Sequence, residues 1–180
     1  MSKKSKKKKK SKKKKATVKI QKTTKNPVTE LDETNDIDEV DEDIARVMKI
    51  LNVANEEGMD VNDHNLKKYF DYLNDHLDFS DLVTGMEDFR WEEYYVFGPG
   101  DQKEYEKLKK KNPSYTDHYQ ILSLEEYGYD ESILVNVKRI SDNKKFSLPL
   151  ADLKSVEKDS INFQVLEDFS MWFWNYRVDA

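Results

Sequence analysis

The clearest folding signal in the chain is the stretch SILVNVKRISDNKKFSLPL, residues 132–150. Ser132 to Ile140 is rich in β-branched residues and predicts a β-strand. The polar tetrad Ser141 to Lys144 predicts a turn, and Lys145 to Leu150 predicts a second strand that pairs back on the first. Pro149 has no backbone N–H to donate, so we expect strand pairing to stop at this edge.

A single turn at residues 151–155 and a helix at residues 161–176 (INFQVLEDFSMWFWNY) are predicted to follow this hairpin. Trp172 and Phe173 are adjacent on that helix, so we expect that they do not both face inward. At least one large aromatic near the end of the helix should then be half exposed, which indicates an interface. The aromatics in question are Trp172, Phe173, Trp174 and Tyr176.

Upstream of the hairpin, apolar spacing predicts helices at residues 44–57 and 62–77, which together form a helical hairpin. Residues 87–97 (EDFRWEEYYVF) predict an aromatic strand, residues 101–111 a charged helix and residues 119–124 another strand. The predicted fold class is therefore α+β. We expect a small, antiparallel, SH3-like and partly open β-barrel that a C-terminal helix closes.

The charge distribution divides the chain into segments. Residues 1–25 contain 14 lysines and no acidic residue, whereas the other residues carry 17 of the 31 basic side chains and all 36 acidic ones, a net charge of −19. We expect a disordered tail, first basic and then acidic, at residues 1–43 because it has little apolar surface to bury. The helical hairpin would occupy residues 44–78, and the β-barrel domain residues 79–180.

Composition also limits the possible functions. The absence of cysteine excludes disulfides, thiolate metal sites and cysteine nucleophiles. No apolar run is long enough for a transmembrane segment or a signal peptide, so we expect a cytoplasmic protein. The scattered histidines and the absence of phosphate-loop or nucleophile-elbow motifs predict that the protein is not an enzyme.

The C-terminal motifs occur in a familiar order. Residues 129–137 read Tyr-Asp-Glu-x-Ile-Leu-Val-x-Val, residues 148–153 Leu-Pro-Leu-Ala-Asp-Leu, residues 159–162 Asp-Ser-x-Asn, and residues 169–175 Phe-Ser-x-Trp-Phe-x-Asn. This order resembles the small bacterial calcium-binding proteins of the CcbP type over about residues 120–177. The resemblance implies Ca²⁺ binding, with ligands at Asp130, Glu131, Asp152 and Asp159.

Oxygen chemistry fits this expectation because Ca²⁺ takes about six to eight oxygen ligands at ~2.3–2.6 Å. Glu157 is near the implied ligands in sequence and joins them as a candidate. The hypothesis is a non-enzymatic calcium buffer or sensor whose ligands are Asp130, Glu131, Asp152, Glu157 and Asp159. The alternative interpretation of these acids is an ordinary solvated surface.

Two other sequence features bear on function. Asp60-x-Asn62-x-His64 imitates the start of an EF-hand loop, but Asn65 replaces the required glycine, so helix capping explains the segment better. The lysine-rich tail suits nucleic acid or another polyanion such as an anionic membrane surface, or it serves solubility and shielding. The second hypothesis is accordingly an SH3-like protein-interaction module that this tail tethers to nucleic acid.

Overall fold

The hairpin at residues 132–150 forms as the sequence predicts. In the computed structural model, which describes residues 41–125 and 132–177, β3 (Leu134–Arg139) pairs antiparallel with β4 (Lys145–Pro149). Asn143 adopts a left-handed backbone with φ of 60° in the connecting turn, a conformation that asparagine tolerates. β4 ends at Pro149 and lies at an edge of the sheet, which confirms the role predicted for that proline.

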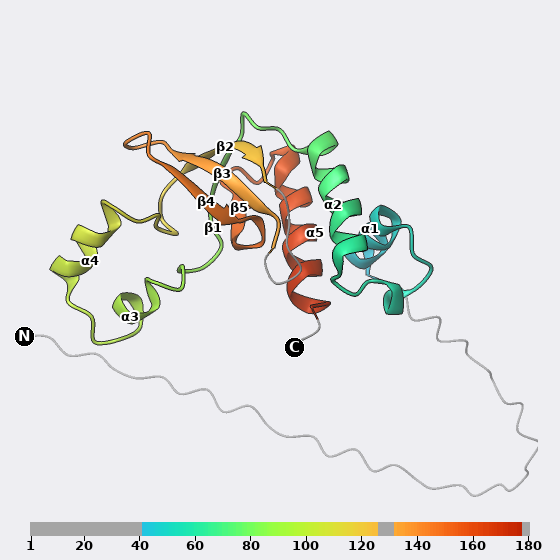
Figure 1. The fold of residues 1–180 in the computed structure, drawn as a ribbon, viewed down its shortest axis with the longest axis horizontal. Helices are drawn as coiled ribbons and strands as arrows, with labels where there is room; N and C mark the ends of the chain where they lie inside the picture. The colour runs from blue at the N-terminus through green and yellow to red at the C-terminus, as the bar shows by residue number, and fades with distance from the viewer. Residues whose placement is uncertain (1–40, 126–131, 178–180) are drawn as a thin grey trace, which may run out of the picture. The chain divides into compact units, whose positions relative to one another are not determined.

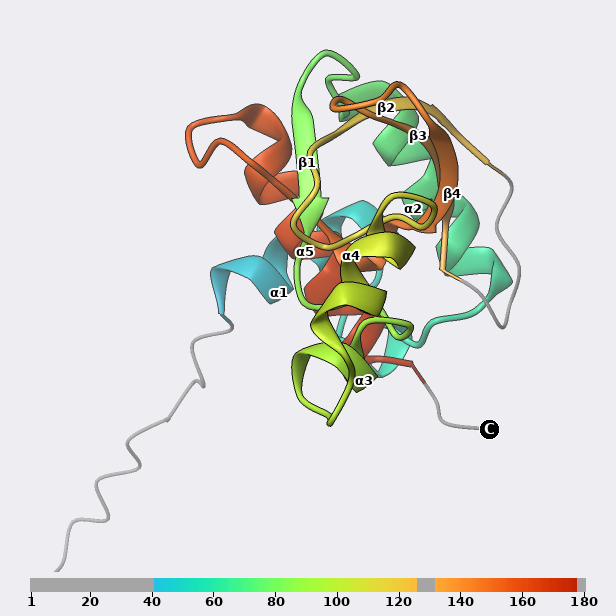
Figure 2. The same cartoon turned by 90° about the vertical axis from the view of Figure 1, so that its left-hand side faces the viewer.

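The sheet has five antiparallel strands in the order β4-β3-β2-β1-β5. β2 (Tyr119–Leu124) lies where the sequence predicts it, whereas β1 (Leu82–Gly85) and β5 (Leu153–Ser155) were not predicted. The sheet curls from β1 to β4 (Figure 2), but β4 and β5 do not pair, so it is not closed into a barrel. The α+β class is confirmed, and the expected barrel is corrected to an open sheet.

Three helices form the layer on one side of this sheet. α5 (Ile161–Asn175) lies between the sheet and α2 (Asp63–His76), and α1 (Glu42–Leu51) packs beside them (Figure 1). The predicted first helix is shorter than expected because Asn52, with φ of 52°, ends it; a short 3₁₀ turn, η1 (Glu56–Gly58), follows. Asn62 accepts a hydrogen bond from the Asn65 backbone N–H, so helix capping explains the segment that resembles an EF-hand loop.

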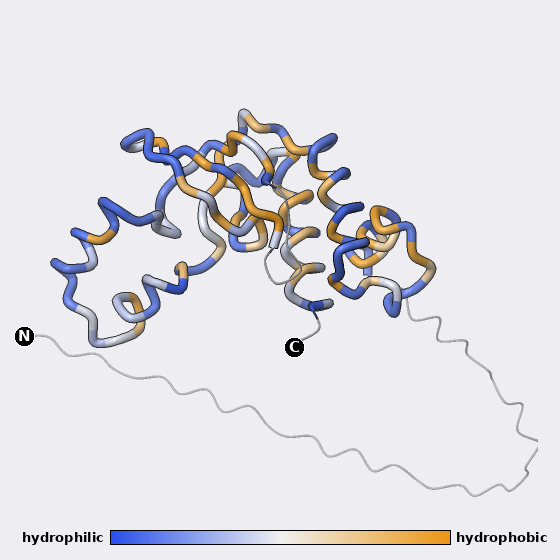
Figure 3. Tube along the Cα trace, viewed as in Figure 1, coloured by the Kyte–Doolittle hydropathy of each residue, from blue (hydrophilic) through white to orange (hydrophobic). Residues whose placement is uncertain are grey.

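The hydrophobic core surrounds α5. Trp172 and Phe173 are both fully buried, so the expectation that they do not both face inward is wrong. The physical reason is that α5 is covered on one side by α1 and α2 and on another by the turn and strand at residues 150–155. The hydropathy colouring in Figure 3 shows apolar residues concentrated on α5 and the central strands. Trp174 is 54% exposed, which confirms that one aromatic in this group faces solvent.

The segment EDFRWEEYYVF does not form the predicted strand. It belongs to a long connection between β1 and β2, the α3–α4 segment (residues 86–118), which contains α3 (Glu93–Val96) and α4 (Gln102–Lys109). Its aromatics pack on one another, with Tyr95 stacked on Tyr105 at 5.6 Å between ring centroids. Local aromatic packing within this segment therefore replaces the strand pairing that the β-propensity of these residues suggests.

A buried carboxylate holds the α3–α4 segment together. Glu92 is fully buried and accepts hydrogen bonds from the Tyr105 hydroxyl at 2.8 Å and the Ser114 hydroxyl at 2.6 Å. It also accepts the backbone N–H groups of Phe89 at 3.2 Å and Tyr115 at 2.9 Å. One side chain thus joins α3, α4 and the return loop (residues 112–118).

The return loop lies directly against β1. The Gly85 N–H and the Thr84 hydroxyl both donate to the Tyr115 carbonyl, at 3.1 and 2.7 Å. A Cβ on Gly85 would lie only 2.6 Å from the Tyr115 Cα, so the close approach of β1 and the return loop requires glycine at this position. Within residues 41–125 and 132–177, no helix has the length and apolar character needed to cross a bilayer.

Candidate cation site

Asp152 is held at the turn that connects the two edge strands of the sheet. It ends η2 (Leu150–Asp152), which follows β4 directly and leads into β5. The Ala151 N–H donates to the Ser132 hydroxyl at 3.3 Å, and the Met86 N–H donates to the Asp152 carbonyl at 2.8 Å. The main chain that carries the Asp152 carboxylate is therefore tied both to the start of β3 and to the end of β1.

The environment of Asp152 disfavours its charged form. Its side chain is half-buried, and burial raises the pKa of its carboxyl above the ordinary value of 3.8. No ion pair involving Asp152 occurs among the described residues. A cation placed beside this carboxylate would reverse the effect, because an opposite charge favours the ionised form.

Three further carboxylates share a cavity with Asp152. This acidic cavity has a volume of about 500 Å³, and Glu87, Asp88 and Glu93 line it together with Asp152. The Asp88 Oδ2 atom is buried and has no hydrogen-bond partner in the described part of the chain. A buried carboxylate oxygen without a donor is unfavourable, so Asp88 presents an oxygen that a ligand would stabilise.

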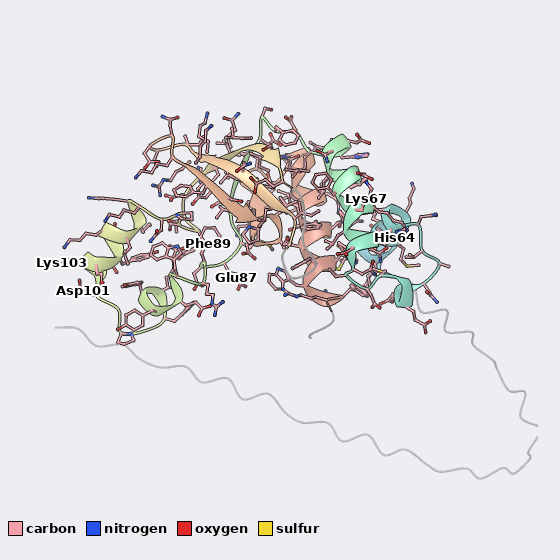
Figure 4. All side chains as sticks on the ribbon, viewed as in Figure 1. His64, Lys67, Glu87, Phe89, Asp101 and Lys103 are labelled. Atoms are coloured by element: carbon pink, nitrogen blue, oxygen red, sulfur yellow. The ribbon has the colours of Figure 1, made fainter. Side chains whose placement is uncertain are left out.

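The sequence did not identify Glu87, Asp88 or Glu93 as site residues. All three lie on the α3–α4 segment, on the residues that were predicted to form a strand. Figure 4 shows Glu87 and Phe89 on the connection from the sheet toward α3, with Asp101 and Lys103 farther along at α4 and with His64 and Lys67 on α2. The available signal was the density of acids in residues 87–93, but nothing in the sequence placed them beside Asp152.

The other predicted ligands lie elsewhere or outside the described residues. Glu157 and Asp159 are exposed and follow the opposite end of β5 from Asp152. Each strand residue advances the chain by about 3.3 Å, so the three-residue strand separates the two ends by roughly 10 Å. Asp130 and Glu131 lie outside the described residues.

No ready-made coordination sphere is present in the described part of the chain. Residues 41–125 and 132–177 contain no group of three or more His, Cys, Asp or Glu side chains arranged to hold a metal ion. The four acidic side chains that line the acidic cavity offer oxygen ligands, which suit Ca²⁺ or Mg²⁺ rather than a thiolate-preferring metal. Arg90 also lines the cavity and offers a competing positive charge.

Comparison with known proteins gives two structural likenesses. No protein-family model and no curated protein matches the chain. A solved structure described as a calcium-binding protein in the calcium-binding form is 15% identical, with a TM-score of 0.47 over 76% of this chain and 93% of that one. The structure of CcbP from Anabaena is 13% identical, with a TM-score of 0.43 over 70% and 98% of the two chains. These likenesses do not assign the chain to a family.

Proposed function

We propose that the protein binds Ca²⁺ without catalysing a reaction and acts as a calcium buffer or sensor. The supporting observation is the pairing of two unusual carboxylates at one cavity. Among residues 41–125 and 132–177, the half-buried Asp152 has no ion-pair partner and one buried oxygen of Asp88 has no hydrogen-bond donor. Both conditions are unfavourable in the empty protein, and a divalent cation would relieve both.

The proposed ligand set combines cavity residues with the ligands predicted from the sequence. Asp88, Asp152 and Glu87 would supply carboxylate oxygens from the cavity, and Asp130 and Glu131 precede Ser132, which is hydrogen-bonded to the turn that carries Asp152. Main-chain carbonyls and water would complete the shell, as is usual for Ca²⁺. The remaining candidates, Glu157 and Asp159, are exposed and are not part of this proposed ligand set.

Calorimetric titration of the full chain with Ca²⁺ in chelator-treated buffer tests the proposal. The double variant Asp88→Asn, Asp152→Asn should lose the binding heat. The control variant Glu157→Gln, Asp159→Asn also removes two negative charges and should retain the heat. A thermal melt adds a second measurement, since a ligand present at 100 times its Kd stabilises the native state by about 2.7 kcal/mol.

Each outcome of this titration has a definite meaning. Absence of heat up to millimolar Ca²⁺, together with an unchanged melting midpoint, would remove the calcium function. Loss of binding only in the Glu157→Gln, Asp159→Asn variant would move the site to the loop before α5. Retention of binding in both double variants would leave Asp130 and Glu131 as the residues to change next.

The lysine-rich tail supports a second proposed function, binding to nucleic acid or another polyanion. Its 14 lysines would release counterions from a phosphate backbone without reading its sequence, and it contains no arginine for paired contacts to a base. Affinity for duplex DNA should then fall steeply with salt and disappear when residues 1–25 are deleted. Ca²⁺ should change neither result, which separates this function from the first.

A further inference from the structure

A second hollow lies between α1 and α5, with a volume of about 790 Å³. Its apolar surface is formed by Met86, Met171 and Trp174. Met86 is 38% exposed and Trp174 is 54% exposed, so large apolar side chains face solvent inside a concave surface. We call this surface the α1–α5 groove. It adjoins the acidic cavity, because Met86 and Trp174 line both.

The rim of the α1–α5 groove is acidic. Asp41 and Glu42 at the start of α1 and Glu167 on α5 are exposed, and none of them forms an ion pair within the described part of the chain. Arg46 is the basic residue among those that line the groove. Its guanidinium is bound by Asp168 through two hydrogen bonds of 2.8 and 2.9 Å, and it also attracts Glu42 and Asp43, so one positive charge offsets only part of the acidic rim.

We propose that the α1–α5 groove is a docking site for a basic peptide segment of a partner protein. A leucine or another bulky apolar side chain of the peptide would pack against Trp174 and the two methionines. Lysines or arginines on either side of it would reach Asp41, Glu42 and Glu167. This inference does not rest on the calcium proposal.

The chemistry of the groove selects this kind of partner. Methionine side chains are unbranched and flexible, so they adapt to different apolar groups. Tryptophan is among the residue types most enriched at the interface positions that contribute most of the binding energy. Acidic rims attract basic segments and repel phosphates, which disfavours nucleic acid at this surface. The acidic rims of two copies would repel each other, which opposes pairing of one groove with another.

Fluorescence anisotropy with the full chain tests the proposal. The probe is a fluorescein-labelled lysine-rich peptide with two leucines one helical turn apart, titrated in the presence of chelator so that the calcium proposal has no influence. Trp174→Ala should weaken binding by about tenfold, as expected for a central aromatic anchor. The control Phe97→Ala removes another aromatic, 81% exposed on the α3–α4 segment, and should bind like the wild type.

The charge contribution needs its own pair of variants. Glu167→Lys and Asp75→Lys reverse one exposed helical carboxylate each and change the net charge equally, but only Glu167 lines the groove. Glu167→Lys should weaken binding several-fold more than Asp75→Lys. Acrylamide quenching of tryptophan fluorescence supplies an independent measurement, because the peptide should shield Trp174 and the shielding should be absent in Trp174→Phe.

Several results would overturn the proposal. Equal weakening by Glu167→Lys and Asp75→Lys would mean that the peptide senses only net charge. Equal affinity for a peptide whose leucines are replaced by serines would remove the apolar contact. If a peptide of residues 1–25 binds as tightly as the leucine probe, the occupant is the chain's own segment instead of a partner. If the chain self-associates and the leucine probe prevents this association, the occupant is a second copy.

Discussion

Removal of the Glu92 carboxylate should release the α3–α4 segment. In Glu92→Ala, four hydrogen-bond donors lose their acceptor: two hydroxyls, on Tyr105 and Ser114, and two backbone N–H groups, on Phe89 and Tyr115. Hydroxyls can turn toward other acceptors, whereas the backbone donors are fixed. Each fixed donor left unpaired in a buried site costs about 1–3 kcal/mol. We therefore expect a loss of about 4 kcal/mol in the free energy of unfolding.

The amide variant Glu92→Gln separates charge from shape. Its oxygen can accept the two backbone N–H groups while its NH₂ donates to the two hydroxyls, which are able to reverse direction. All four partners stay satisfied, and only the extra strength of hydrogen bonds to a charged acceptor is lost. We expect a cost of about 1–2 kcal/mol for this variant.

Urea denaturation followed by tryptophan fluorescence measures both variants, with Glu93→Ala as the control. Glu93 is the exposed neighbour of Glu92, and its substitution should change stability by less than about 0.5 kcal/mol. Hydrogen exchange of residues 86–118 should increase in Glu92→Ala, because the loss falls first on that segment. A Glu92→Ala protein as stable as Glu93→Ala, or a Glu92→Gln protein as unstable as Glu92→Ala, would refute the reasoning.

Three other perturbations have expected outcomes. Trp172→Phe removes the 2.6 Å hydrogen bond from the buried indole N–H to the Met59 carbonyl and should cost about 1–3 kcal/mol by chemical denaturation. Trp174→Phe removes a longer bond, 3.3 Å to the Ala151 carbonyl, from a side chain that is 54% exposed, and should cost less than about 0.5 kcal/mol. Gly85→Ala should cost about 1–3 kcal/mol by the same measurement, since its new methyl overlaps the return loop. The raised pKa of Asp152 means that the native state holds more protons than the unfolded state just above pH 3.8, so its contribution to stability should fall as pH rises through that window. Asp152→Asn should remove this contribution to the pH dependence of the melting midpoint. Calorimetry should show that the Ca²⁺ affinity of the wild type falls as pH decreases toward the same window, because protons compete with Ca²⁺ for the carboxylate.

Local signals predicted most of the elements that carry their own periodicity. β2 matches its predicted residues, and the hairpin, α2, α4 and α5 begin and end within about two residues of the prediction. These segments combine a repeated apolar pattern with a turn or capping residue at their ends. β1 and β5 were missed because strands of four and three residues are too short to show alternation, and pairing with each other and with β2 stabilises them.

The buried environment of α5 was beyond a periodicity argument. A single apolar stripe identifies one contact face, but α5 is covered on more than one side, so Trp172 and Phe173 are both buried although they are adjacent. The sequence placed only part of the candidate site. Asp152 was identified from the resemblance, whereas Asp88 reaches the same cavity because it follows β1 by three residues, at the end where the Met86 N–H is hydrogen-bonded to the Asp152 carbonyl.

The pairing of β1 with β5 has a consequence for synthesis of the protein. β1 lacks one of its two neighbours, and the first two helices lack the surface on which they pack, until residues 153–175 have left the ribosome. A nascent chain that ends before this point would keep apolar faces open to solvent and to chaperones. Cooperative folding is therefore expected to begin only once α5 has emerged, and truncation within α5 should yield an aggregating product rather than a smaller stable domain.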